Sequence, residues 1–205
     1  MVKKSSRHWL QEHATDLYVK QAKLSGFRSR AAYKLLQLHE RDRLFKTGMI
    51  VIDLGSSPGG WSQVVAQLVK PKGKVFALDL LPMEPISGVD YVQGDFTQEA
   101  TFNALLKKLS EIQADWVISD MAPNMSGNAS IDVPRSLYLA ELALDFSLKL
   151  LNNQGGFLVK VLQGEGFNSL LDQIKGSFKK VVIRKPKASR GRSKEVYILA
   201  RERKK

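Results

Sequence analysis

The chain has 205 residues, 43% of them hydrophobic, and it contains no cysteine. A chain of this length can bury one sizeable core, so we expect a single domain over residues 1–205. The absence of cysteine excludes a disulfide framework, a thiolate metal site and a cysteine nucleophile, and we expect no metal. No run of 18 apolar residues and no signal-peptide pattern occur, which predicts a cytoplasmic protein without a membrane-spanning segment.

The net charge of +12 is concentrated at the two ends of the chain. Residues 1–33 hold seven lysines and arginines against two acids, and residues 175–205 hold thirteen against two. We expect a basic N-terminal arm over 1–33, a core over 34–200 and a solvated basic tail over 201–205. Such a surface favours a polyanionic partner, with RNA, DNA and anionic membrane all open. The basic segment 184–194 favours a loop that follows a nucleic-acid backbone.

Helical spacing and short apolar runs alternate along the chain. In chain order, they predict a helix at 29–40, a strand at 49–54, a helix at 61–69, strands at 74–80 and 89–93, a helix at 99–109, a strand at 115–120, a helix at 135–151, a strand at 156–161, a helix at 168–178, and strands at 180–184 and 195–200. This order predicts an α/β, Rossmann-like fold with helices on both faces of a seven-stranded, mostly parallel sheet. The last strand, which follows a loop without a helix, is expected to be antiparallel. The first helix places Lys34 outside the repeating unit, free to reach over its top.

A glycine-rich loop, DLGSSPGGW at residues 53–61, follows the first predicted strand. Ligands of open α/β sheets bind beyond the carboxyl ends of the strands, and glycines let the backbone approach a ligand closely. The spacing differs from the G-x-G-x-x-G of dinucleotide folds, and Pro58 lacks an amide for an anion. The loop therefore favours a ligand without phosphate, although the glycines alone are also compatible with a plain tight turn.

Acids end the next two predicted strands. Asp79 can accept hydrogen bonds from both ribose hydroxyls of an adenosine, and Asp95, beside Phe96, can accept one from an adenine amino group. One such acid is often only a helix cap, but two in succession after a glycine loop favour an adenosine ligand.

The fourth predicted strand ends in Asp120-Met121-Ala122-Pro123-Asn124, which would face the reacting atoms. If the ligand is a methyl donor, this segment lacks the Asp/Asn-Pro-Pro-aromatic motif typical of enzymes that methylate exocyclic amines. Methylation at C5 of a pyrimidine normally needs a cysteine, which is absent. An oxygen acceptor fits what remains.

Four segments carry a resemblance to a known family. They are DLGSSPGGW at 53–61, DMAPNMSG at 120–127, KVLQGEG at 160–166 and SKEVY at 193–197. Together they resemble the FtsJ/RrmJ family, and within it the bacterial members that methylate the ribose of a uridine in the A-loop of large-subunit (23S) rRNA. The match runs from about residue 9 to residue 200; the family often has alanines at positions 56 and 57, where serines stand here.

The resemblance implies S-adenosylmethionine (SAM) as cofactor, large-subunit rRNA as partner, no membrane partner, and a monomer. It implies cofactor contacts at Gly59, Trp61, Asp79 and Asp95, with Asp120 near the methionyl end of SAM. RNA contacts are expected from the basic segments near both ends of the chain, at Arg28, Arg30, Arg190, Arg192 and Lys194.

The family's catalytic tetrad corresponds to Lys34, Asp120, Lys160 and Glu195. Lys160 lies in an apolar strand, where a lysine is costly unless it works or is paired. We expect Lys160 to be the base or orienter of a 2′-hydroxyl, with Asp120 and Glu195 fixing its ammonium. Lys34 would tune the site or bind the target phosphate. A nicotinamide oxidoreductase, a non-catalytic RNA-binding assembly factor and a tRNA methylase stay as alternatives.

Overall fold

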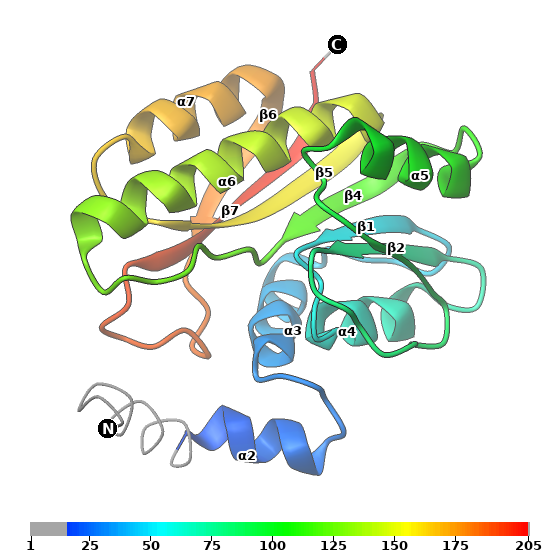
Figure 1. Cartoon of the computed structure of the whole chain (residues 1–205), viewed down its shortest axis with the longest axis horizontal. Coiled ribbons are helices and arrows are strands. Elements are labelled where there is room, and N and C mark those ends of the chain that lie inside the picture. Colours follow the sequence, from blue (N-terminus) through cyan, green and yellow to red (C-terminus); the bar gives the residue numbers. More distant parts are fainter. Residues whose placement is uncertain (1–15, 205) are drawn as a thin grey trace.

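The computed structural model describes residues 16–204 and contains one seven-stranded sheet in the order β3-β2-β1-β4-β5-β7-β6 (Figure 1). The strands are β1 (Ile50–Leu54), β2 (Lys74–Asp79), β3 (Val89–Gln93), β4 (Ala114–Ser119), β5 (Leu151–Leu162), β6 (Phe178–Arg184) and β7 (Glu195–Arg203). β1 to β5 pair in parallel, whereas β7 is antiparallel to both β5 and β6. The expected α/β fold with an antiparallel seventh strand is confirmed.

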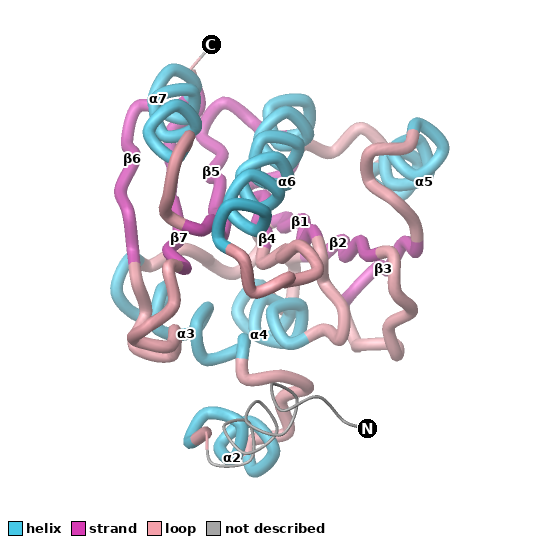
Figure 2. The backbone as a smooth tube through the Cα atoms, turned by 60° about the vertical axis from the view of Figure 1, so that its left-hand side comes forward, coloured by secondary structure: helices cyan, strands magenta, loops and turns pink. Residues whose placement is uncertain are grey.

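Helices cover both faces of the sheet. They are α2 (Leu17–Leu24), α3 (Ala31–Asp42), α4 (Gly60–Val69), α5 (Glu99–Leu109), α6 (Ala129–Leu150) and α7 (Phe167–Ser177). α3 and α4 lie against one face and α5, α6 and α7 against the other, with α2 lying beyond α3 (Figures 1 and 2). Among these described helices, none is long and apolar enough to cross a membrane.

The long helix α6 begins six residues before its expected start at residue 135. The Asn128 side chain accepts a hydrogen bond from the Ser130 amide at 3.1 Å and so caps the helix. Pro134 falls in the second turn, where the loss of one amide did not end the helix. The expected start after Pro134 was wrong, because Asn128 caps the helix and the helix continues through the proline.

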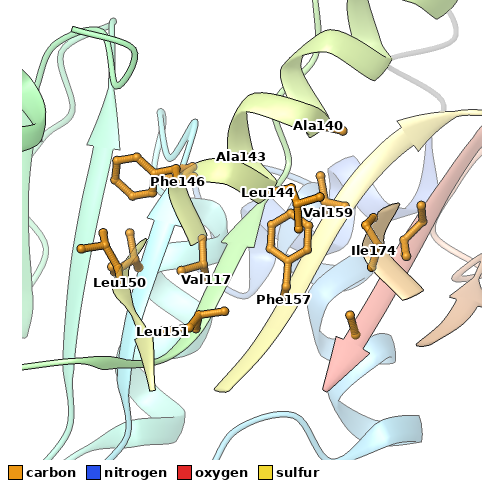
Figure 3. Close-up of a cluster of buried hydrophobic side chains, with 14 of the residues drawn as sticks. Val117, Ala140, Ala143, Leu144, Phe146, Leu150, Leu151, Phe157, Val159 and Ile174 are labelled. Carbon is orange, nitrogen blue, oxygen red and sulfur yellow. The ribbon is translucent and has the colours of Figure 1, made fainter. Parts of the chain in front are cut away.

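Two apolar clusters hold the layers together. On the α6 side, Leu144 lies beside Phe157 and Val159 of β5 (Figure 3). On the other side, Trp61 of α4 is part of the cluster that includes Leu158 and Tyr197. Since successive side chains of a strand point to opposite faces, every second residue of β5 belongs to one cluster.

This alternation decides where the polar residues at the strand ends lie. Lys160 shares the face of Leu158, on the α3 and α4 side. By the same count, three acids at or just beyond the ends of β1, β2 and β4 belong to that face: Asp53, Asp79 and Asp120. One edge of one face therefore gathers the acids and the buried lysine.

Both ends of the described chain contain structure that the sequence patterns missed. α2 lies within the expected basic arm, whose residues before Asp16 are outside the described part. β7 continues to Arg203, so residues 201–203 belong to the sheet and not to the expected tail. Arg203 donates to the Leu151 carbonyl at 2.7 Å, and the Arg201 guanidinium lies over the Trp116 ring at 5.3 Å. These partners keep the last cations of β7 on the protein.

Candidate active site

Two lysine–carboxylate pairs lie side by side at the carboxyl edge of the sheet. Lys160 Nζ is 3.2 Å from Asp120 Oδ1 and also donates to the main-chain carbonyl of Asp120. Lys34 Nζ, from α3, is 2.7 Å from Glu195 Oε1 at the start of β7. All four side chains are between 9% and 16% exposed. The structure thus brings the four residues of the expected tetrad together.

Their pairing differs from the expectation in one respect. Glu195 was expected to fix the ammonium of Lys160, but it pairs with Lys34 instead. The physical reason is that α3 packs on the face of the sheet that carries Tyr197 of β7. The Lys34 side chain of α3 therefore lies next to the carboxylate of Glu195. Lys160 is held by Asp120 alone among the acids of the tetrad.

The hydroxyl of Tyr197 joins the two pairs. It lies 2.7 Å from Asp120 Oδ1 and 3.3 Å from Glu195 Oε1, and the side chain is completely buried. Tyr197 is the register partner of Lys160 in the antiparallel β5–β7 ladder, which sets the two side chains beside each other. Burial, reinforced by the negative charges of Asp120 and Glu195, raises the pKa of Tyr197 well above 10, so the phenol keeps its proton as a donor.

Sequence reasoning did not assign Tyr197 a role, although a signal was present. Tyr197 follows Glu195 by two residues, so a strand there places both side chains on one face.

The surroundings of Asp120 lower its pKa. Burial alone would raise it, but the charges of Lys160 and Lys34 and the Tyr197 hydrogen bond together lower it. Asp120 is therefore ionised at neutral pH.

Asp53 is a second buried acid that the sequence reading left without a role. Its Oδ2 accepts a hydrogen bond from the Ser62 hydroxyl at 2.6 Å, while its Oδ1 has no hydrogen-bond partner within the described chain. Burial raises the pKa of Asp53 to about 7; the nearby charges of Asp120 and Asp79 add to this rise, and the Ser62 hydrogen bond opposes it. The Ser56 hydroxyl is likewise buried without a partner among residues 16–204. Orphaned polar atoms of this kind are rare and indicate a missing partner.

Asp79 and Asp95, the two acids expected to bind the adenosine, accept hydrogen bonds from residues of their own loops. Asp79 accepts the Leu81 amide at 2.8 Å and the Ser57 amide at 2.9 Å, which ties the glycine loop to the end of β2. Asp95 Oδ1 accepts both the amide and the hydroxyl of Thr97 before α5. A carboxylate offers about four acceptor positions, so both acids retain capacity for a ligand.

The glycine loop is shaped by the protein as well as by any ligand. Gly55 has φ +73°, and a Cβ there would lie 2.2 Å from Cγ of Met121. Gly59 has φ +107°, and its Cβ would lie 2.6 Å from Cδ1 of Ile86. Trp61 is buried, and its indole donates to the Ala31 carbonyl at 2.8 Å. Its ring is thus committed to the core, which leaves only its main chain at the start of α4 for a cofactor.

Among the residues expected to contact RNA, Arg28 uses its guanidinium for hydrogen bonds within the protein. Its guanidinium donates to three main-chain carbonyls of the loops after β1 and β2, those of Pro58, Glu84 and Pro85, at 2.6–3.2 Å. Arg28 therefore braces the glycine loop.

The other expected RNA contacts lie near or on the loop 185–194. Arg30 forms an ion pair with Asp16, whose Oδ2 is 4.0 Å from Nε of Arg190. Arg192 and Lys194 are exposed on the same loop. The structure thus groups these four cations on one side of the tetrad, with an acid of the chain between two of them.

The sheet order, with an antiparallel strand inserted beside the last parallel one, and a charged site beyond a glycine loop define a Rossmann-like methyltransferase. Residues 27–203 match the family of FtsJ-like methyltransferases, and the chain belongs to this family. The resemblance carried by the four sequence segments is confirmed.

Relatives match over nearly the whole chain. It is 52% identical over 198 residues to ribosomal RNA large subunit methyltransferase E of Cellvibrio japonicus, covering 97% of this chain and 94% of the relative. It is 55% identical over 196 residues to the protein of that name from Alkalilimnicola ehrlichii, covering 96% and 94%. A crystal structure from Plasmodium falciparum, of a protein described as a ribosomal RNA methyltransferase, has a TM-score of 0.78 at 31% identity and covers 86% of this chain and 98% of that one.

The tyrosine bridge predicts a loss of stability in Tyr197→Phe. The change removes a buried hydroxyl that donates to the ionised carboxylate of Asp120, and such a hydrogen bond is worth about 1.5–3 kcal/mol. We expect the free energy of unfolding in urea to fall by about that amount. Tyr138→Phe is the control, because Tyr138 is 59% exposed and should leave the free energy unchanged. Equal stabilities of the two variants would contradict a structural bridge at Tyr197.

Proposed function

We propose that the chain is a SAM-dependent ribose 2′-O-methyltransferase whose substrate is large-subunit rRNA, at a uridine of the A-loop. The observation that carries the proposal is the buried pair Lys160–Asp120, joined through Tyr197 to the pair Lys34–Glu195. The names of the relatives, ribosomal RNA large subunit methyltransferase E, support the substrate. We further propose that the protein acts as a monomer in the cytoplasm.

The residues at the carboxyl edge fit SAM. SAM carries a positive sulfonium and a positive amino group. The carboxylates of Asp79 and Asp120 lie close enough to that of Asp53 to raise its pKa. The orphaned Oδ1 of Asp53 and the orphaned hydroxyl of Ser56 offer an acceptor and a donor that the described protein does not use. A cationic ligand would relieve the repulsion among the three acids.

The adenosine end of SAM would be held by Asp79 and Asp95. Asp79 would accept the ribose hydroxyls in charge-assisted hydrogen bonds, and Asp95 would accept the adenine amino group. Gly59 and the main chain of Trp61, at the start of α4, would border the cofactor from the other side. Asp120 would lie at its methionyl end.

When bound, SAM supplies a methyl carbon that its sulfonium makes electrophilic. The protein must hold the ribose 2′-oxygen in line with that carbon, and positioning of this kind can lower a barrier by about 7–11 kcal/mol. Nζ of Lys160 orients the 2′-hydroxyl and, as the free base, accepts its proton. Asp120, itself hydrogen-bonded to Tyr197, holds that nitrogen, while Lys34, fixed by Glu195, binds the phosphate next to the target ribose.

The RNA backbone would follow the basic side of the site. Arg192 and Lys194 are exposed there, Arg190 lies on the same loop, and Arg30 lies beside it. Phosphate contacts from such residues supply sequence-independent affinity and position the substrate. Arg28 would contribute indirectly, because it holds the glycine loop in place.

Cofactor binding should depend on pH through Asp53. A cation beside Asp53 favours its ionised form, so SAM should lower the Asp53 pKa from about 7 and release protons on binding. Affinity should therefore strengthen between about pH 5 and pH 7, by up to about tenfold per pH unit, and level off above pH 7. Calorimetry in buffers of different ionisation enthalpy measures both effects.

Two controls isolate the charge. S-adenosylhomocysteine lacks the sulfonium charge and should show a weaker dependence, and Asp53→Asn should lose it. A wild-type affinity for SAM that is independent of pH, without proton release, would contradict the role of Asp53.

Lys160→Ala and Lys160→Arg should both nearly abolish methyl transfer, because a guanidinium cannot act as the base. Single-turnover transfer of labelled methyl from SAM to large-subunit rRNA measures this, and calorimetry should give a SAM affinity close to that of the wild type. Lys149→Arg, on the exposed side of α6, is the matched control. A Lys160→Arg enzyme with most of its activity would exclude the base role and leave Lys160 as a fixed cation.

Replacing Arg192 and Lys194 with alanine should weaken RNA binding and flatten its salt dependence. A plot of log K against log salt has a negative slope, and each lost phosphate contact should make that slope less steep by about 0.7–0.9. The double variant Lys107→Ala, Lys108→Ala removes the same charge from exposed positions of α5 and should keep the slope. Equal slopes in the two double variants would mean that the loop carries no RNA contact.

A further inference from the structure

Ser189 contacts the carboxylate of Glu195 from within the basic loop. Its hydroxyl donates to Glu195 Oε1 at 2.7 Å, and the residue is only 6% exposed. The same oxygen is 2.7 Å from Lys34 Nζ and 3.3 Å from the Tyr197 hydroxyl. All three contacts that the described residues make with this carboxylate therefore meet on one oxygen, which fixes its rotamer and directs its second oxygen away from them.

The helix that carries Lys34 also holds the loop beside Ser189. The Ala188 amide donates to Gln37 Oε1 at 2.9 Å, and the Ala188 carbonyl accepts from the Arg30 guanidinium. Residues 30, 34 and 37 follow the helical spacing of one face of α3. One helix face thus sets the position of the Lys34 ammonium and of the main chain next to Ser189.

The next residue along the chain is more exposed and has a different partner. The Arg190 side chain is 31% exposed, and its Nε is 4.0 Å from Asp16 Oδ2. The loop is otherwise compact, because Lys185 Nζ donates to the carbonyls of Gly191 and Ser193. A polyanion that contacts Arg190 therefore acts on the chain one peptide bond from the hydroxyl that fixes Glu195.

We infer that Ser189 is a positioning residue, which makes the orientation of Glu195, and through it Lys34, depend on the basic loop 185–194. The inference rests on the proposed function and adds to it a link between RNA contact and the reactive geometry. The Ser189 hydroxyl holds Glu195 in the orientation that the reaction needs, and RNA bound to the loop acts on that hydrogen bond. Without that hydrogen bond, Glu195 and Lys34 reorient while SAM and RNA still bind.

The test compares Ser189→Ala, Ser189→Cys and Ser189→Thr with the wild type. Cysteine keeps the size of the buried side chain but is a weak donor, and threonine keeps the hydroxyl. With SAM and rRNA both saturating, single-turnover rates of the alanine and cysteine variants should fall at least tenfold, about 1.4 kcal/mol. Their rate-against-pH profiles should shift, whereas dissociation constants for SAM and RNA should stay within twofold.

Ser189→Thr should recover most of the rate. The matched control is Ser177→Ala, which removes a hydroxyl that donates to the Gln173 carbonyl at 3.1 Å, remote from the tetrad, and should behave as the wild type. An active wild type with equally active Ser189→Ala and Ser189→Cys variants, or variants that lose only RNA affinity, would overturn this inference alone. A wild type that transfers no methyl would overturn the proposed function and this inference with it.

Discussion

A single hydrogen-bonded tyrosine joins two buried ion pairs, and the candidate site depends on that arrangement. Charges removed from water cost several kcal/mol each unless they are paired and hydrogen-bonded. Here two lysines pair with two carboxylates, and the Tyr197 hydroxyl lies within hydrogen-bond distance of both acids. The sheet makes this possible because β4, β5 and β7 each deliver one member to the same face, while α3 delivers Lys34 from above. The loss of any member would leave its partner buried and unpaired.

Much of this could be predicted from the sequence. The alternation of strands and helices predicted the sheet, and the family resemblance implied which four residues form the tetrad. A lysine in an apolar strand also indicated a paired or working group at Lys160. Other features depend on tertiary geometry. The pairing of Lys34 with Glu195 follows from where α3 crosses β7, and the position of Tyr197 follows from the β5–β7 register. No local sequence pattern specifies the pairing of Lys34 or the position of Tyr197.

Charge composition predicted less about individual cations than about the surface as a whole. Both ends of the chain are basic, yet Arg28 and Arg203 donate to main-chain carbonyls of the protein and Arg30 pairs with Asp16. A count of charges cannot distinguish arginines that bond within the protein from exposed cations such as Lys194. The acids behave differently: their strand-end positions follow from the period of two, so the repulsion around Asp53 follows directly from the fold.

The central claim is that a ribose hydroxyl of large-subunit rRNA receives the methyl group. The most direct measurement incubates the protein and labelled SAM with large ribosomal subunits from cells lacking the enzyme, then digests the rRNA to nucleosides. The account predicts that the label appears in 2′-O-methyluridine from the A-loop, and that it is absent when Lys160→Ala replaces the wild type. Label in a base-methylated nucleoside, or none in rRNA from an active preparation, would contradict it.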